Sequence, residues 1–222
     1  MINGIETLLL QFDIALEPNE LSLFRGAINA VLEQHHVLFH NHTEGGYRYA
    51  YPLIQYKLLE GKASMIAVGD GIPALQHLLA SQHSFLQIGR KMYPLVVERC
   101  VPSATELALE DNPQTYLLSQ WLPLNDDNFR EFQHLRSLRM RLEMLERLFC
   151  ANVLSMLKGL GIEVTEQIEC SIVEVKRQKM VRHKGVQLLS FDLVIDTNIT
   201  LPLYLGVGKS VSLGHGILMP LK

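Results

Sequence analysis

The sequence predicts an α+β protein built from two tandem ferredoxin-like β-α-β-β-α-β domains, the second less regular than the first and ending in a glycine-rich loop. Three observations predict this fold: the order of apolar runs in the first half, a similar start to the second half, and clustered glycines near the end. A chain of 222 residues has room for two domains of about 100 residues with separate cores. We expect the domains to span residues 1–112 and 113–222.

The first half alternates strand-like and helix-like segments. An apolar run over residues 5–14 is typical of a strand, and the Pro18-Asn19 signal starts a helix expected over 19–33. Its apolar face is expected to hold Leu23, Ala27, Ala30 and Val31. The remaining elements are a hairpin over 52–59 and 63–69, a helix beginning at Pro73, and an extended stretch over 92–102. RNA-recognition domains (RRMs) share this topology.

The second half begins in the same way. Polar residues 103–113 are expected to form a linker, and residues 115–124 a strand. One long amphipathic helix is expected over 128–157, ended by Gly159 and Gly161. Its apolar stripe consists of Phe132, Leu135, Leu138, Leu142, Leu145, Phe149, Val153 and Leu157. Two strands around a basic turn, the glycine-rich loop and a last strand complete the half.

Charge is divided unevenly along the chain. Residues 1–129 carry 7 Lys/Arg against 14 Asp/Glu, whereas residues 130–222 carry 13 against 9, within a net charge of −3. Such a split is a hint of polyanion binding by one half, although an uneven surface without a purpose explains it equally well. The sequence has no membrane-length apolar run and no basic leader, and its three cysteines form no CxxC pair. A cytoplasmic protein without membrane contact or a structural zinc is expected.

Four of the nine histidines, His35, His36, His40 and His42, lie within eight residues. In an extended segment, His40 and His42 project to the same side. Because imidazole titrates near neutral pH, such a pair supplies one general base and one general acid, as metal-free RNA cleavage requires. Spacing alone leaves open two alternatives, a zinc site formed with His35 or His36 and a cluster without a role.

The glycine-rich loop spans residues 206–216. Gly206, Gly208, Gly214 and Gly216 surround Lys209 and Ser210. Glycines let backbone N–H groups approach an anion, and a lysine adds a positive charge. The spacing does not match a Walker A loop or a dinucleotide fingerprint, so a nucleoside triphosphate role is disfavoured. A tight turn within a sheet is the alternative explanation.

A basic turn lies between the two strands that precede the loop. Its cations are Lys176, Arg177, Lys179, Arg182 and Lys184. A turn of this charge is suited to contacts with RNA phosphates, which supply affinity without sequence information. A solvated turn without a ligand would have the same composition.

Together these motifs resemble one family. Residues 39–72, from FHNHTEGGYRYAYPLIQYK onward, and the tail LPLYLGVGKSVSLGHGILMP resemble the two ends of the CRISPR-associated repeat-RNA-processing endoribonucleases, in their subtype I-B-like branch. The resemblance implies two ferredoxin-like domains. It also implies cleavage of CRISPR repeat RNA without metal or cofactor, through 2′-hydroxyl attack that leaves a 2′,3′-cyclic phosphate.

In that branch the paired histidines act in catalysis, which corresponds to His40 and His42 here. The glycine-rich loop binds RNA in the family, which corresponds to Gly206, Gly208, Lys209, Ser210, Gly214 and Gly216. One departure is His215, because the second glycine pair of the family usually brackets a phenylalanine. Repeat RNA is the expected partner. Subunits of a CRISPR effector complex and a second copy of the chain are further expected partners.

Overall fold

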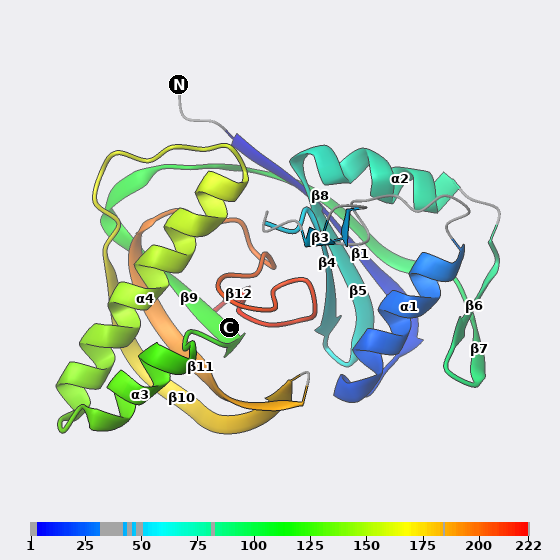
Figure 1. Cartoon of the computed structure of the whole chain (residues 1–222). Helices are drawn as coiled ribbons and strands as arrows, with labels where there is room; N and C mark the ends of the chain where they lie inside the picture. The colour runs from blue at the N-terminus through cyan, green and yellow to red at the C-terminus, as the bar shows by residue number, and fades with distance from the viewer. Residues whose placement is uncertain are drawn as a thin grey trace. The chain divides into compact units, whose positions relative to one another are not determined.

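The computed structural model describes residues 4–31, 42–43, 46–47, 51–80, 83–183 and 185–221. The chain forms two compact units (Figure 1). The N-terminal unit consists of Ile5–Ala104 together with Ser212–Gly214, and the C-terminal unit consists mainly of Thr105–Val211 and His215–Lys222. Among the described residues, no helix is both long and apolar enough to span a membrane.

The N-terminal unit confirms the ferredoxin-like prediction. Its sheet has the order β4-β5-β1-β8, so the first strand lies between the third and fourth strands of the pattern. The strands are β1 (Gly4–Ala15), β4 (Ile54–Leu59), β5 (Lys62–Val68) and β8 (Val97–Glu106), and the two crossovers contain α1 (Leu21–Val31) and α2 (Ile72–Ala80). Short 3₁₀ turns, η1 (Pro18–Glu20) and η2 (Gly69–Gly71), precede the two helices.

Both helices cover one face of this sheet, because residues of α1, α2, β1, β4 and β5 share one core. Phe24 of α1 packs edge-on against Phe12 of β1, with ring centroids 5.8 Å apart. The expected helix face was partly wrong. Ala27 is buried as expected, but Leu23 and Ala30 are exposed, Leu23 by 48%, and Leu21, Phe24 and Ile28 are buried in their place. Spacing of three and four fits both sets, and the structure has the one that buries the large ring of Phe24.

The expected strand over 92–102 is interrupted. A separate hairpin, β6 (Phe85–Ile88) and β7 (Lys91–Pro94), precedes β8. This hairpin was not expected from the sequence. Its signal is Gly89, which has φ 59° in a two-residue turn between alternating segments.

The C-terminal unit repeats the same strand order without a second crossover helix. Its sheet is β10-β11-β9-β12, formed by β9 (Leu109–Trp121), β10 (Cys170–His183), β11 (Val186–Ile199) and β12 (Ile217–Pro220). Residues 200–216 connect β11 to β12 as a loop, which confirms the less regular second domain. The expected linker over 103–113 was wrong, because β8 and β9 extend through all of it except Leu107-Ala108.

The single long helix was also wrong. The segment forms two helices, α3 (Asp126–His134) and α4 (Leu138–Gly159). Ser137 interrupts the helix with φ −113° and ψ 150°, and its side chain accepts a hydrogen bond from Met140 N. Serine is a strong N-cap residue, so a new helix starts there. Leu138 is consequently 70% exposed, although it belongs to the expected apolar stripe.

Candidate nucleic-acid interface

The backbone of one expected catalytic residue lies in a small hairpin of the N-terminal unit. Strands β2 (His42–Thr43) and β3 (Gly46–Tyr47) pair antiparallel, with His42 opposite Tyr47. His40 lies outside the described residues, as do His35 and His36, and the side chain of His42 is not described either. The cooperation of His40 and His42 therefore stays a prediction. An extended conformation at His42 is the backbone state on which that prediction depends.

The base of the glycine-rich loop is a β-like turn in the C-terminal unit, to which residues 206–211, 215 and 216 belong. Val207 N donates a hydrogen bond to Gly216 O at 2.8 Å, and Leu218 N donates one to Leu205 O at 3.0 Å. These bonds align 205–207 with 216–218, on the side of β12 that is not paired with β9. The loop therefore has a defined base in the sheet.

The glycines of this loop are required by its own geometry. Gly208, Gly214 and Gly216 have φ of 93°, 77° and 64°, where other residues are strained. A Cβ on Gly206 would lie 2.5 Å from Val211 Cβ, and one on Gly208 would lie 2.5 Å from Asn152 Oδ1. Packing and backbone conformation thus explain the pattern. Binding of RNA by these four glycines stays a prediction.

The side chain of Lys209, in the same loop, is held by a backbone carbonyl outside the loop. Its Nζ donates a hydrogen bond to Leu124 O at 3.0 Å. Burial lowers the pKa of Lys209, and the nearby Asp126 carboxylate partly opposes that shift. An ammonium group has three donors, so this bond leaves two for other acceptors. Ser210, the next residue, adopts φ 57°.

His215 is positioned by a residue that sequence analysis missed. Its Nδ1 lies 3.2 Å from Gln120 O, and Gly216 N donates to the same oxygen at 3.1 Å. A carbonyl oxygen only accepts hydrogen bonds, so Nδ1 carries the proton and Nε2 is the acceptor nitrogen of the neutral ring. Gln120 itself has φ 51°, and its backbone N donates to Asp192 Oδ1 at 2.6 Å. No pattern in the sequence marks Gln120 or Asp192.

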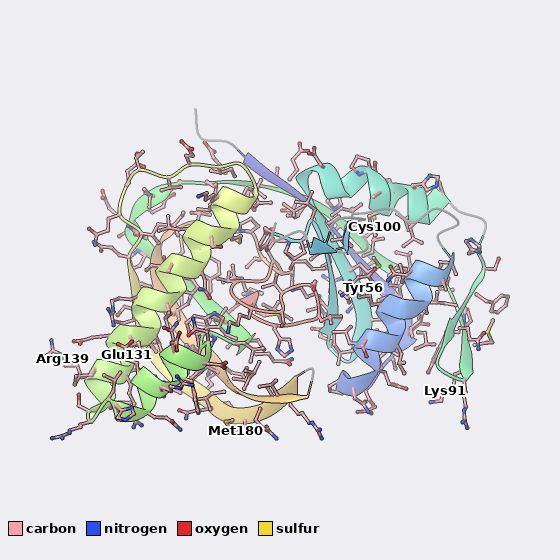
Figure 2. The ribbon with its side chains drawn as sticks, in the orientation of Figure 1. Tyr56, Lys91, Cys100, Glu131, Arg139 and Met180 are labelled. Atoms are coloured by element: carbon pink, nitrogen blue, oxygen red, sulfur yellow. The ribbon has the colours of Figure 1, made fainter. Side chains whose placement is uncertain are left out.

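The predicted basic turn was wrong in its conformation, because its four described cations lie within strand β10, in the outer part of the β10–β11 hairpin. Lys176, Arg177, Lys179 and Arg182 are all exposed, whereas Lys184 lies outside the described residues. Lys176 is paired with Glu174 at 3.0 Å, and Arg177 Nε lies 3.7 Å from Asp192 Oδ2. In Figure 2 the labelled Met180 marks this part of the hairpin. The cations are accessible to a polyanion, as phosphate binding requires.

Lys57, in the strand that follows the histidine-rich segment, was also missed. It is 0% exposed and is paired across the sheet with Ser64, which in turn lies opposite Gln11. All three side chains are buried on the sheet face opposite the helices. Burial lowers the pKa of Lys57 to about 7. A lysine that loses its charge near neutral pH is unusual and is typical of functional or strained positions.

The described part of the chain contains no group of three or more His, Cys, Asp or Glu side chains suited to a metal ion. The three cysteines are free thiols. The histidine cluster lies outside the described side chains.

Comparison with known proteins gives matches over nearly the whole chain. The family models for the Cas6b N-terminal and C-terminal domains match residues 3–106 and 108–221. The uncharacterized protein MJ0978 of Methanocaldococcus jannaschii is 32% identical over 112 residues, which cover 50% of this chain and 75% of that protein.

Solved structures agree on the fold. A crystal structure of Cas6b has a TM-score of 0.89 at 24% identity, covering 99% of this chain and all of the other. A structure described as the CRISPR RNA processing endoribonuclease Cas6b has a TM-score of 0.75 at 23% identity over the same shares. Thermus thermophilus Cas6 has a TM-score of 0.59 at 12% identity, covering 98% of both chains. Because the two domain models together match almost every residue, the chain belongs to the Cas6b family.

Proposed function

We propose that this chain cleaves CRISPR repeat RNA without a metal ion and releases guide RNAs that end in 2′,3′-cyclic phosphates. As a member of the Cas6b family, the chain is an endoribonuclease that processes CRISPR RNA. The observation that carries the proposal is the match of both halves to this family, on a fold made of two ferredoxin-like units.

In the proposed mechanism, one of His40 and His42 takes the proton from a 2′-hydroxyl, which attacks the adjacent phosphate. The other histidine protonates the departing 5′-oxygen. Attack breaks the P–O5′ bond while the P–O2′ bond forms, so the products are a cyclic phosphate and a 5′-hydroxyl. Two imidazoles perform both transfers because one is neutral and the other is protonated at the same pH.

The glycine-rich loop and the basic hairpin are proposed to hold the RNA. Lys209 has two further ammonium donors, and the exposed cations of the β10–β11 hairpin supply phosphate contacts. The loop is anchored at both ends by backbone hydrogen bonds, so it presents Lys209 and His215 at fixed places within the C-terminal unit. Subunits of an effector complex and a second copy of the chain are proposed as further partners.

The histidine pair is tested by separating binding from cleavage. We expect His40→Ala and His42→Ala to keep the affinity for labelled repeat RNA and to cut it about 100-fold or more slowly, since each loses one proton transfer. EDTA should leave wild-type cleavage unchanged. His77→Ala is the matched control, because His77 is exposed on α2 of the same unit.

Each alternative gives a different result. Cleavage abolished by EDTA and restored by zinc would replace the acid-base pair with a metal site. Tight binding without any cleavage by the wild-type chain would make it a repeat-RNA-binding protein. Wild-type rates in both histidine variants would remove the proposed catalytic roles.

A further inference from the structure

The β6–β7 hairpin is an addition to the ferredoxin-like pattern of the N-terminal unit, inserted between α2 and β8. Its inner face is built into the core: Leu86 and Ile88 are 0% and 3% exposed, and Tyr93 packs against the same cluster. Leu95 N donates to Ser84 O at 2.9 Å and closes the open end. The hairpin is therefore held firmly on its unit.

The outer face of the same hairpin carries large apolar side chains that are exposed. Phe85 is 58% exposed and Met92 is 62% exposed. Phe85 is paired with Pro94, and Gln87 with Met92, so these four side chains share one face. Proteins that bind single-stranded nucleic acids present exposed aromatic rings on which the bases stack. A firmly held strand with an exposed phenylalanine is suited to this contact.

Charge at this hairpin differs from that of the surrounding half. Residues 71–97 contain no Asp or Glu, although residues 1–129 contain 14 of them. Arg90 and Lys91 lie at the turn, are exposed, and form no ion pair with another described residue. Figure 2 shows Lys91 at the tip of the hairpin, pointing away from the unit.

Three other cations of the N-terminal half are already engaged, whereas Arg99 of β8 is exposed like those of the hairpin. Lys57 is buried, Lys62 is paired with Asp13 and Glu98 at 3.1 and 2.6 Å, and Arg25 lies 6.0 Å from the centroid of the Tyr56 ring. The hairpin therefore combines an exposed aromatic face with two accessible cations, in a stretch that lacks acidic residues.

We propose that the outer face of the β6–β7 hairpin is an additional binding site for single-stranded RNA. A base stacks on Phe85 beside Met92, and the RNA continues past the turn, where Arg90 and Lys91 contact its phosphates. Lys91 is paired with Ile88, so it reaches the RNA at the end of the hairpin and not on the face of Phe85. The site rests on the proposed function in that RNA is the ligand of the chain. Exposed apolar residues also suit a protein partner, but paired arginine and lysine at the turn, without a neighbouring carboxylate in the stretch, favour a polyanion.

Stacking is tested directly by Phe85→Trp. The wild-type chain has one tryptophan, Trp121, which is 0% exposed, and its fluorescence change on RNA binding is subtracted from that of the variant. We expect titration with 2′-O-methyl repeat RNA, which cannot undergo 2′-hydroxyl attack, to quench its fluorescence at saturation. Leu138→Trp is the matched control, because Leu138 is 70% exposed on the C-terminal unit.

Affinity is tested with truncated side chains and the same RNA. We expect Phe85→Ala to weaken binding on the order of tenfold, since stacking on one aromatic side chain contributes about 1–3 kcal/mol per base. Arg90→Gln with Lys91→Gln should lower the slope of log Kd against log salt by about 1.4, at about 0.7 for each lost phosphate contact. Leu138→Ala and Arg139→Gln, exposed on α4, should leave affinity and slope unchanged.

Unquenched indole fluorescence in the Phe85→Trp variant, together with wild-type affinity in the alanine and glutamine variants, would overturn the site and would favour a protein partner for this face. That result is distinct from failure of the proposed function. In the latter case the wild-type chain itself would not bind or cleave repeat RNA.

Discussion

At the scale of single residues, Lys57 makes the stability of the folded chain depend on pH above neutrality. The pKa of its ammonium group is lowered from 10.5 to about 7 because the side chain is buried. Between these pH values the unfolded chain binds a proton that the folded chain does not, so the free energy of unfolding rises with pH. Below about pH 7, Lys57 is protonated in both the folded and the unfolded chain, so its contribution to the free energy of unfolding no longer changes with pH.

We expect Lys57→Met to flatten this dependence. The free energy of unfolding of the wild-type chain should rise between pH 7 and 10 by up to about 1.4 kcal/mol per pH unit relative to the variant. Urea unfolding at pH 6, 7, 8.5 and 10 measures the difference. Lys62→Met is the control, because Lys62 is a partly exposed surface lysine of the same sheet. Parallel curves for wild type and Lys57→Met would contradict the lowered pKa.

Alanine substitutions at Gly216 and Gly161 distinguish the cost of a strained backbone from the cost of steric overlap. Gly216 and Gly161 both have positive φ, 64° and 76°, but a Cβ on Gly216 meets the Val207 carbonyl, whereas one on Gly161 meets nothing within 4 Å. We expect Gly161→Ala to cost about 1 kcal/mol of unfolding free energy and Gly216→Ala to cost about 2 kcal/mol or more beyond that. Equal losses in urea unfolding would mean that the loop base yields to the new methyl group.

At the scale of elements, the pattern of apolar residues predicted the strands correctly but did not predict where a helix is interrupted. The β4–β5 hairpin and the strand-helix-hairpin start of each half were predictable, because buried strands show a clear period. The α3–α4 break was missed, since the stripe of apolar residues continues through it while Ser137 caps a new helix. The apolar spacing predicts one continuous helix, whereas the capping serine predicts a new start, and the sequence alone does not decide between the two.

The motifs proposed for the site are visible in the sequence, but the residues that support the glycine-rich loop are not. Clusters of histidine, glycine and cations are visible as motifs in the sequence. Gln120 and Asp192, which hold His215 and Gly216, come from β9 and β11 and have no common signature. Their role depends on strand pairing and on the left-handed backbone of Gln120, which a single sequence does not encode in any short pattern.

The basic hairpin gives a prediction at the same scale. Removing the two exposed cations furthest along β10, in Lys179→Gln with Arg182→Gln, should weaken RNA binding by similar factors for all RNA sequences. The slope of log Kd against log salt should fall by about 1.4. Lys158→Gln, at the exposed end of α4, serves as the control. Loss of affinity for one RNA sequence alone would indicate base contacts instead.

At the scale of the whole molecule, the two units are not two consecutive pieces of chain. Ser212–Gly214 belong to the N-terminal unit, where Tyr56 N donates to Ser212 O at 3.0 Å and Leu213 forms a parallel bridge with Tyr56. The outer edge of β4 is thereby covered, which protects an exposed strand from pairing with another chain. The expected boundary after residue 112 stays a prediction about where the domains would separate.

Hydrogen exchange of the Tyr56 amide measures how well Ser212–Gly214 cover the edge of β4. We expect Gly214→Ala to speed exchange of the Tyr56 amide, because Gly214 has φ 77° and its new methyl group would lie 2.8 Å from Leu21 Cδ2. Gly61→Ala is the control in the same unit, since Gly61 has φ 76° with nothing within 4 Å. Faster exchange in both variants alike would show that the tail does not protect this amide.

The place of Ser212–Gly214 has a consequence for the order of events on the ribosome. The chain is made from its N-terminus, and domains commonly fold as they emerge. Here the first unit lacks the cover of its β4 edge until synthesis reaches Gly214, after almost all of the second unit has been made. An uncovered edge is a site for wrong pairing between nascent chains. During synthesis, the edge of β4 therefore stays uncovered until Ser212–Gly214 have been made.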